Sequence, residues 1–146
     1  MKIQIYNSYQ TIGTLEKQNL VNFLFQHLEE FGDTKTAIEK AIDYSVGESS
    51  QIGGFVLVGT IDEKIAGVVV VNRTGMEEYI PENILVYIAV DASLRGQGIG
   101  KKLMKEAVYM AKGNIALHVE PNNPAKFLYE KIGFTNKYLE YRLIRS

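Results

Sequence analysis

The chain has 146 residues, of which 46% are hydrophobic and 23% are charged, so it carries enough apolar material for the core of one domain over residues 1–146. The formal net charge of −1 excludes a global attraction to nucleic acid or to an acidic membrane, so any phosphate binding must be local. With no cysteine, the chain has no disulfide, no thiolate metal site and no cysteine nucleophile.

Neither a targeting segment nor a membrane span is expected. The N-terminus, Met1–Ile5, lacks the long apolar run of a signal peptide. The longest apolar stretch, around Gly67–Val71, is far too short to cross a bilayer. We therefore expect a cytoplasmic protein that does not bind membranes.

The N-terminal third predicts one strand and two amphipathic helices. Residues 3–5 alternate between apolar and polar side chains, as on a strand. Apolar residues then recur at intervals of three and four over residues 15–31, which predicts a helix, and a second such pattern covers residues 37–42. The residues that end these helices or can cap the second one are Gly32, Asp33, Thr34 and Gly47.

The middle of the chain predicts strands. Two β-rich runs, Phe55–Thr60 and Ile65–Asn72, are joined by the short polar link Asp62–Lys64 and form a hairpin. A loop over residues 72–81 follows. The run Ile84–Val90 is almost continuously apolar, which predicts a central strand buried on both faces.

The last third predicts a helix, a strand, a short helix and a final strand. Apolar residues line one face of a helix after residue 98, and Ile115–Val119 is a short strand. Pro124 begins a helix that Gly133 ends, and Tyr138–Ile144 is the last strand. The order β-α-α-β-β-β-α-β-α-β predicts an α+β protein whose mixed sheet has helices on its faces.

A glycine-rich turn between the central strand and the following helix is the main candidate binding site. Gly96, Gly98 and Gly100 let the backbone turn sharply and approach a ligand closely. The helix that follows presents unpaired N–H groups and the positive end of its dipole, a site suited to phosphate. Lys101 and Lys102 add local positive charge, and the side chain of Arg95 is long enough to reach a phosphate as well.

Two other phosphate motifs fit this turn less well. A dinucleotide-binding fingerprint needs G-x-G-x-x-G in the first strand–helix turn of a wound parallel sheet, whereas this chain has G-x-G-x-G after hairpin-linked strands. A Walker A loop needs Gly-Lys-Ser/Thr, which Gly100-Lys101-Lys102 does not supply.

Two motifs together indicate which ligand the glycine-rich turn binds. The segment V-D-x-x-x-R-G-Q-G-I-G-x-x-L, from Val90 to Leu103, resembles the R/Q-x-x-G-x-G/A signature of the GCN5-related N-acetyltransferase (GNAT) family. The segment N-N-P-A-K-F-L-Y-E-K-I-G-F, from Asn122 to Phe134, resembles the second motif of that family. The two motifs stand in the family's order, with one strand between them.

This resemblance implies a GNAT-like acyl-CoA N-acyltransferase fold. Its sheet is mostly antiparallel, but the strands Ile84–Val90 and Ile115–Val119 run parallel and splay apart. Acetyl-CoA, as co-substrate, lies between them, and no metal takes part. The implied donor-binding residues are Ile88, Ala89 and Val90 for the pantetheine, Arg95, Gly96, Gln97, Gly98, Ile99, Gly100 and Lys101 for the pyrophosphate, and Asn122 and Asn123 for the pantetheine arm.

The resemblance also implies direct attack of an amine on the thioester, with Tyr129 near the sulfur as general acid. The base is less well defined, because Ile84–Val90 lacks the carboxylate that many relatives carry there. Glu82 lies just before this strand, and His118 takes the place of a glutamate in the family's ribosomal-protein enzymes. An imidazole with a pKa of about 6.5 is well suited to accept a proton. Glu120 and Tyr87 are further candidates.

The acceptor is expected to be a primary amine of a small molecule or of a peptide or protein N-terminus. An enzyme without a strong base suits an amine of low pKa. The alternative function is a non-catalytic acyl-CoA-binding or sensor module on the same fold. A C-terminal strand at the edge of the sheet would also permit pairing into a homodimer.

Overall fold

The computed structural model describes residues 1–47 and 52–145. Its elements, in chain order, are β1 (Lys2–Tyr6), α1 (Thr14–Leu28), the 3-10 helix η1 (Glu29–Phe31), α2 (Lys35–Ser45), β2 (Gly54–Ile61), β3 (Lys64–Arg73), β4 (Asn83–Val90), the 3-10 helix η2 (Ala92–Leu94), α3 (Ile99–Met110), β5 (Ile115–Ala116) and α4 (Lys126–Ile132).

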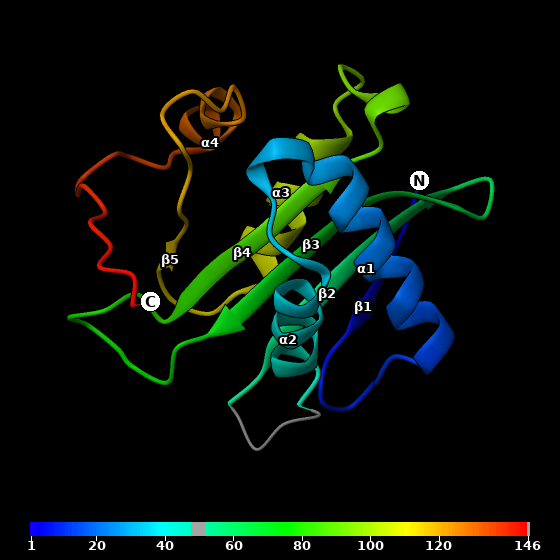
Figure 1. The fold of residues 1–146 in the computed structure, drawn as a ribbon, viewed down its shortest axis with the longest axis horizontal. Helices are drawn as coiled ribbons and strands as arrows, with labels where there is room; N and C mark the ends of the chain where they lie inside the picture. The colour runs from blue at the N-terminus through cyan, green and yellow to red at the C-terminus, as the bar shows by residue number, and fades with distance from the viewer. Residues whose placement is uncertain (48–51, 146) are drawn as a thin grey trace.

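The strands form one mixed sheet in the order β1-β2-β3-β4-β5 (Figure 1). The first four strands pair antiparallel with their neighbours. β4 and β5 run parallel and pair only at Asn83–Ile115 and Ile84–Ala116. The predicted α+β class, with a mostly antiparallel sheet and a splayed parallel pair, is therefore confirmed.

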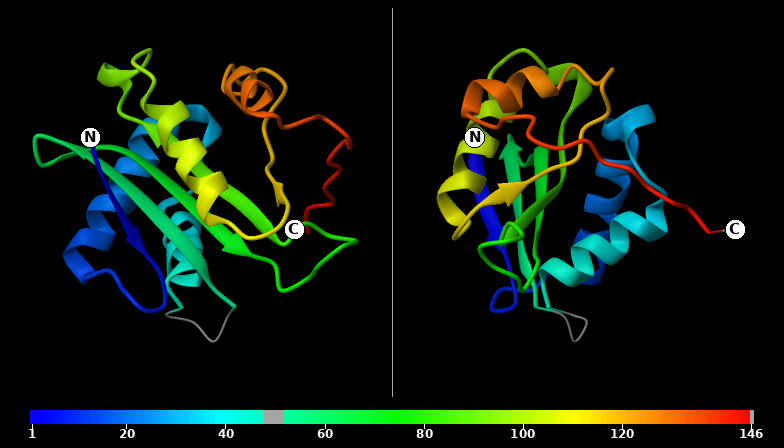
Figure 2. Two further views of the ribbon diagram at one scale, coloured as in Figure 1. Left: turned by 180° about the vertical axis from the view of Figure 1, so that it is seen from behind. Right: turned by 90° about the vertical axis from the view of Figure 1, so that its left-hand side faces the viewer.

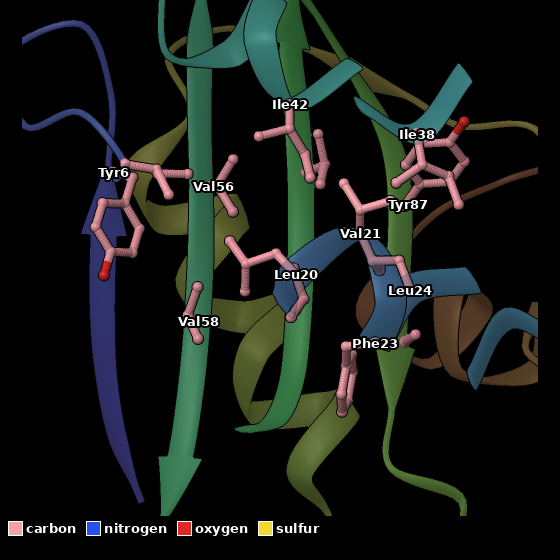
Figure 3. Packing of buried hydrophobic residues seen from close by; sticks show 14 of the residues in the cluster. Tyr6, Leu20, Val21, Phe23, Leu24, Ile38, Ile42, Val56, Val58 and Tyr87 are labelled. Carbon is pink, nitrogen blue, oxygen red and sulfur yellow. The ribbon is translucent and has the colours of Figure 1, made fainter. Parts of the chain in front are cut away.

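Helices cover both faces of the sheet, and each face has its own hydrophobic core (Figure 2). α1 and α2 lie on one face, where Leu20, Leu24 and Ile38 are fully buried (Figure 3). α3 and α4 lie on the other face (Figure 2). The apolar faces predicted for α1, α2 and α3 from the spacing of their apolar residues are therefore the faces that pack in the cores.

Local chemistry explains where several elements begin and turn. The side chain of Thr34 accepts a hydrogen bond from the N–H of Ala37, so it is Thr34 that caps α2. Asp62 and Glu63 both have positive φ, of 51° and 65°, as a two-residue hairpin turn requires. The hairpin prediction is confirmed.

β4 contains a bulge that changes which face its side chains occupy. Val70 pairs with Tyr87 and Val71 pairs with Leu85, so Val86 is an extra residue on β4. Without the bulge, positions 85 and 87 would point to the same face. Instead, Leu85 packs in the core with α3 and α4, whereas Tyr87 packs in the core with α1 and α2.

Two predictions about strands were wrong. Tyr138–Ile144 is not a strand: no backbone hydrogen bond among the described residues involves it, and its apolar side chains are exposed. β5 ends at Ala116 rather than at Val119, so it offers this segment almost no ladder to pair with. β4 packs in both hydrophobic cores as predicted, with buried residues alternating with half-buried ones.

Among the described residues, no helix is both long and apolar enough to cross a membrane.

The packing of α3 on β3 sets the position of the glycine-rich turn. Leu103 of α3 is fully buried, and a Cβ added at Gly67 of β3 would lie 2.4 Å from its Cδ1 atom. Gly67 thus leaves the space that Leu103 fills. Because α3 begins directly after Gly98, this contact holds the start of the helix in place.

We predict that Leu103→Ala lowers the free energy of unfolding by about 2–5 kcal/mol, since it leaves a cavity between α3 and β3. Urea denaturation measures this loss. The control is Val108→Ala on the exposed side of the same helix, which should change the free energy of unfolding by no more than about 0.5 kcal/mol. Equal losses in the two variants would contradict the packing role of Leu103.

Candidate donor site and catalytic residues

The glycine-rich turn follows β4 and has an open surface. Asp91 first caps η2 by accepting a hydrogen bond from the N–H of Ser93. Gly96 and Gly98 then both adopt φ of 82°, a left-handed conformation that favours glycine. A Cβ added at either glycine would have no atom within 4 Å. The turn therefore exposes bare backbone at the start of α3.

The first turn of α3 provides hydrogen-bond donors at this surface. Its first intrahelical hydrogen bond runs from the N–H of Lys102 to the carbonyl of Gly98. The N–H groups of residues 99–101 precede that bond and have no acceptor within the helix. Together with the helix dipole, they form an anion site of the kind that binds phosphate.

Arg95 contacts α1 and η1. Its Nη1 atom lies 2.9 Å from a carboxylate oxygen of Glu29, and its Nη2 atom donates to the carbonyl of His27 over 2.7 Å. The N–H of Ala92 donates to Nδ1 of His27 over 3.1 Å. The segment before the glycines is thus tied to the end of α1, and the expected contact of Arg95 with phosphate stays a prediction.

Tyr129 lies on α4, on the α3 side of the sheet, and its side chain is 8% exposed. It belongs to the same hydrophobic cluster as Ile88 and Val90 of β4. No hydrogen bond from a described residue reaches its hydroxyl group. Burial raises the pKa of Tyr129 to about 12, so the hydroxyl keeps its proton at neutral pH.

The other predicted site residues differ in their hydrogen bonds. Asn123 accepts a hydrogen bond from the N–H of Ala125 and so holds the start of the α4 region, whereas Asn122 is exposed. His118 is exposed beyond the end of β5. Asn122 and His118 form no hydrogen bond with another described residue.

Glu82 lies at the far end of β4 from the glycine-rich turn. Its carboxylate accepts hydrogen bonds from the N–H groups of Asn114, over 2.6 Å, and Glu78, over 3.1 Å. These bonds, that from Asn114 above all, lower the pKa of Glu82. The neighbouring Asn83 donates to the carbonyl of Lys112 over 2.7 Å. Both residues thus fasten β4 to the segment that leads into β5.

The sequence patterns did not predict the hydrogen bond between Tyr87 of β4 and Asp33, which precedes α2. The hydroxyl of Tyr87 donates to Asp33 over 2.5 Å, although the two residues are 54 positions apart. The only available signal was a tyrosine within an otherwise apolar strand. The hydrogen bonds of His27 with Ala92 and Arg95 also join segments that are far apart in the chain, so no local pattern predicted them.

Residues 53–136, more than half of the chain, match the family model described as "Acetyltransferase (GNAT) domain". The chain therefore belongs to the GNAT family of acetyltransferases, whose members use acetyl-CoA as co-substrate.

Solved structures with the same fold include three acetyltransferases of low sequence identity. A structure described as a probable acetyltransferase has a TM-score of 0.72 at 18% identity and covers 100% of this chain and 99% of its own. An aminoglycoside antibiotic 6'-N-acetyltransferase from Acinetobacter haemolyticus has a TM-score of 0.72 at 13% identity, with 100% and 99% coverage. A ribosomal-protein-alanine N-acetyltransferase from Brucella melitensis biovar Abortus 2308 has a TM-score of 0.67 at 16% identity, with 100% and 99% coverage. These likenesses concern the fold.

No protein of curated function matches the chain significantly in sequence.

We predict that Gly98→Ala weakens coenzyme A binding about tenfold, because the new Cβ occupies the surface that a phosphate would approach and keeps the phosphate away from the backbone N–H groups. Calorimetric titration with coenzyme A measures this. The substitution should also cost about 1–2 kcal/mol of stability through its left-handed φ. Gly13→Ala is the control, since Gly13 has φ of −67° and equally open surroundings. Unchanged affinity in Gly98→Ala would place the pyrophosphate elsewhere.

Proposed function

We propose that this protein transfers the acetyl group of acetyl-CoA directly to a primary amine. The observation that carries the proposal is the placement of two features along β4. The anion site of the glycine-rich turn follows the end of the strand. The buried hydroxyl of Tyr129, which has no hydrogen-bond partner among the described residues, lies on α4 in the cluster that includes Ile88 and Val90.

The donor would lie along the part of β4 that β5 leaves unpaired. The pairing of β4 with β5 ends at Ile84, so the backbone of Ile88, Ala89 and Val90 has no strand on that side. We propose that the pantetheine binds there like an added strand, with the pyrophosphate on the N–H groups of residues 97–101. Asn122 is exposed and available to contact the pantetheine arm.

The reaction needs no covalent enzyme intermediate. The neutral amine nitrogen attacks the thioester carbonyl carbon, and the oxyanion that forms accepts a hydrogen bond from a backbone N–H near Val90. The C–S bond then breaks, and the thiolate of coenzyme A takes a proton from Tyr129. The proton that the amine nitrogen loses leaves to a base or to water, and Tyr129 is reprotonated from solvent. The products are the acetylated amine and the free thiol.

The raised pKa of Tyr129 shapes its role. A phenol with a pKa of about 12 is a weaker acid than a thiol with a pKa of about 8.5, so full proton transfer to the thiolate is uphill. A hydrogen bond to the developing negative charge on sulfur is favourable without transfer. We assign Tyr129 to this stabilisation and to the final protonation of the leaving group.

Glu82 and His118 differ in their suitability as the base. Glu82 is a poor candidate, because its carboxylate is occupied by backbone hydrogen bonds and its pKa is lowered. We retain His118 as the candidate, since its side chain is exposed and unoccupied by described residues. The weaker the base, the more the reaction depends on an acceptor that is already neutral.

An amine panel with acetyl-CoA tests the proposal. At pH 7 a lysine-type amine is neutral about once in 2,500 molecules, and an α-amine about once in seven. We therefore predict turnover of peptide N-termini with at least tenfold higher kcat/KM than of lysine side chains, measured by release of free thiol. Equal turnover would contradict the preference for a low pKa.

The same assay separates the enzyme from its alternative. The absence of a carboxylate from β4 favours a non-catalytic acyl-CoA-binding module as the second candidate. That function requires tight acetyl-CoA binding with no amine-dependent thiol release anywhere in the panel.

We predict that Tyr129→Phe lowers kcat about 100-fold and leaves the KM for acetyl-CoA within about threefold, because only the leaving group loses a donor. Stability should be retained, since the hydroxyl forms no hydrogen bond with a described residue. With a pKa of about 12, Tyr129 stays protonated throughout the neutral and moderately alkaline range, so the wild type should show no alkaline decline due to Tyr129 below about pH 11. Tyr109→Phe, on the exposed side of α3, is the control. A Tyr129→Phe variant with unchanged kcat would remove Tyr129 from the mechanism.

A further inference from the structure

The connection between η1 and α2 crosses β4 on the face opposite α3 and α4 (Figure 1). Asp33 lies in this connection and is exposed to solvent. Tyr87 projects from β4 toward the same connection, and Figure 3 shows its ring beside Ile38 with the hydroxyl at the edge of the core. The hydroxyl donates to the carboxylate of Asp33 over 2.5 Å. A buried side chain of the central strand thus holds an exposed carboxylate in place.

The negative charge of Asp33 has no cationic partner within residues 1–47 and 52–145. Glu29 and Asp43 form ion pairs with Arg95 and Lys17, whereas Asp33 is one of several exposed carboxylates that form none with another described residue. Lys35, the cation nearest to Asp33 in the sequence, lies 5.2 Å from the ring centre of Phe25. The hydroxyl of Tyr87 therefore orients the carboxylate of Asp33 without neutralising its charge.

The position of this carboxylate relates it to the donor. Tyr87 directly precedes Ile88, where the proposed pantetheine-binding stretch of β4 begins. The bulge at Val86 turns Tyr87 toward α1 and α2, while Ile88 and Val90 face the cluster that contains Tyr129. Asp33 therefore approaches the same stretch of β4 from the opposite side of the sheet.

We infer that Asp33, held by Tyr87, binds a positively charged group of the acceptor, so that the acceptor is a primary amine with a second cationic group. This inference rests on the proposed acetyl transfer. Asp33 contacts the substrate, and Tyr87 is a positioning residue. The chemistry that Asp33 recognises is present in a diamine and in a peptide N-terminus followed by a basic side chain, and the preference for an amine of low pKa favours the peptide.

The second charge also suits the reaction. A positive charge near the reacting ammonium group disfavours its charged form and so lowers its pKa. The neutral, nucleophilic fraction is larger as a result. This effect acts in the free acceptor and weakens once Asp33 pairs with the second cationic group, so the inference rests on the charge and position of Asp33.

The test compares matched acceptors in matched variants. The small-molecule pair is 1,5-diaminopentane and 5-aminopentan-1-ol, and the peptide pair is Ala-Lys amide and Ala-Gln amide. Asp33→Asn removes the charge but keeps an oxygen that can accept from Tyr87, so the fold should persist. Glu30→Gln is the control, because Glu30 is an exposed carboxylate of η1, three residues before Asp33, and its side chain forms no hydrogen bond or ion pair with another described residue.

We predict that Asp33→Asn lowers the preference for the cationic member of one pair about five- to tenfold, through the KM of that acceptor. The KM for acetyl-CoA and the turnover of the neutral member should stay unchanged. Glu30→Gln should keep the wild-type preference. Tyr87→Phe should lose part of the preference, also through KM, because the carboxylate is present but no longer held. The pair that responds identifies a diamine or a peptide acceptor.

An unchanged preference in Asp33→Asn, or an equal loss in Glu30→Gln, would overturn the inference while leaving acetyl transfer intact. If no amine is acetylated, the proposed function fails instead, and a binding measurement then decides the inference. Calorimetric titration of 1,5-diaminopentane and of Ala-Lys amide into the coenzyme A-bound protein should show weaker binding of at least one of them to Asp33→Asn than to wild type. Equal binding of both would overturn it.

Discussion

The parallel pairing of β4 with β5 covers only two residue pairs, and the geometry of the donor site depends on it. At this end of the pairing, Asn83 and Glu82 hold β4 next to β5 through hydrogen bonds to the segment around Asn114. Beyond Ile84 no described strand lies beside β4 on the β5 side, and the backbone polar groups that point to that side must be satisfied by other means. A longer pairing would satisfy them within the protein and leave no edge for a ligand to join. The short ladder therefore creates the edge that we assign to pantetheine.

The end of α1 and the segment that follows it are attached to the β4 region at two points. At one point Glu29 and His27 hold Arg95 and Ala92, just before the glycine-rich turn. At the other, Asp33 accepts the hydrogen bond from Tyr87. The proposed donor site and the proposed acceptor-binding carboxylate thus share one structural support. A change that displaces this segment should affect both substrates, whereas the loss of one carboxylate should affect only one.

Much of the fold could be predicted because its signals are local. The helical periods of α1, α2 and α3, the polar link between β2 and β3 and the glycines after β4 each lie within a few consecutive residues. The final strand at Tyr138–Ile144 could not be judged in that way, because a strand forms only where a neighbour offers a ladder. β5 ends at Ala116 and offers almost none, so an apolar, strand-like segment remains irregular and exposed.

The sequence by itself determined the family, through the motifs from Val90 to Leu103 and from Asn122 to Phe134. These motifs can be recognised in the sequence because a glycine-rich turn and the start of a helix depend mainly on the residues that form them. Only the tertiary structure decided which side chains meet. The bulge at Val86 depends on pairing with β3, and it alone turns Tyr87 toward Asp33. Contacts between residues so far apart in the chain leave no periodic pattern, since they arise from the packing of whole elements.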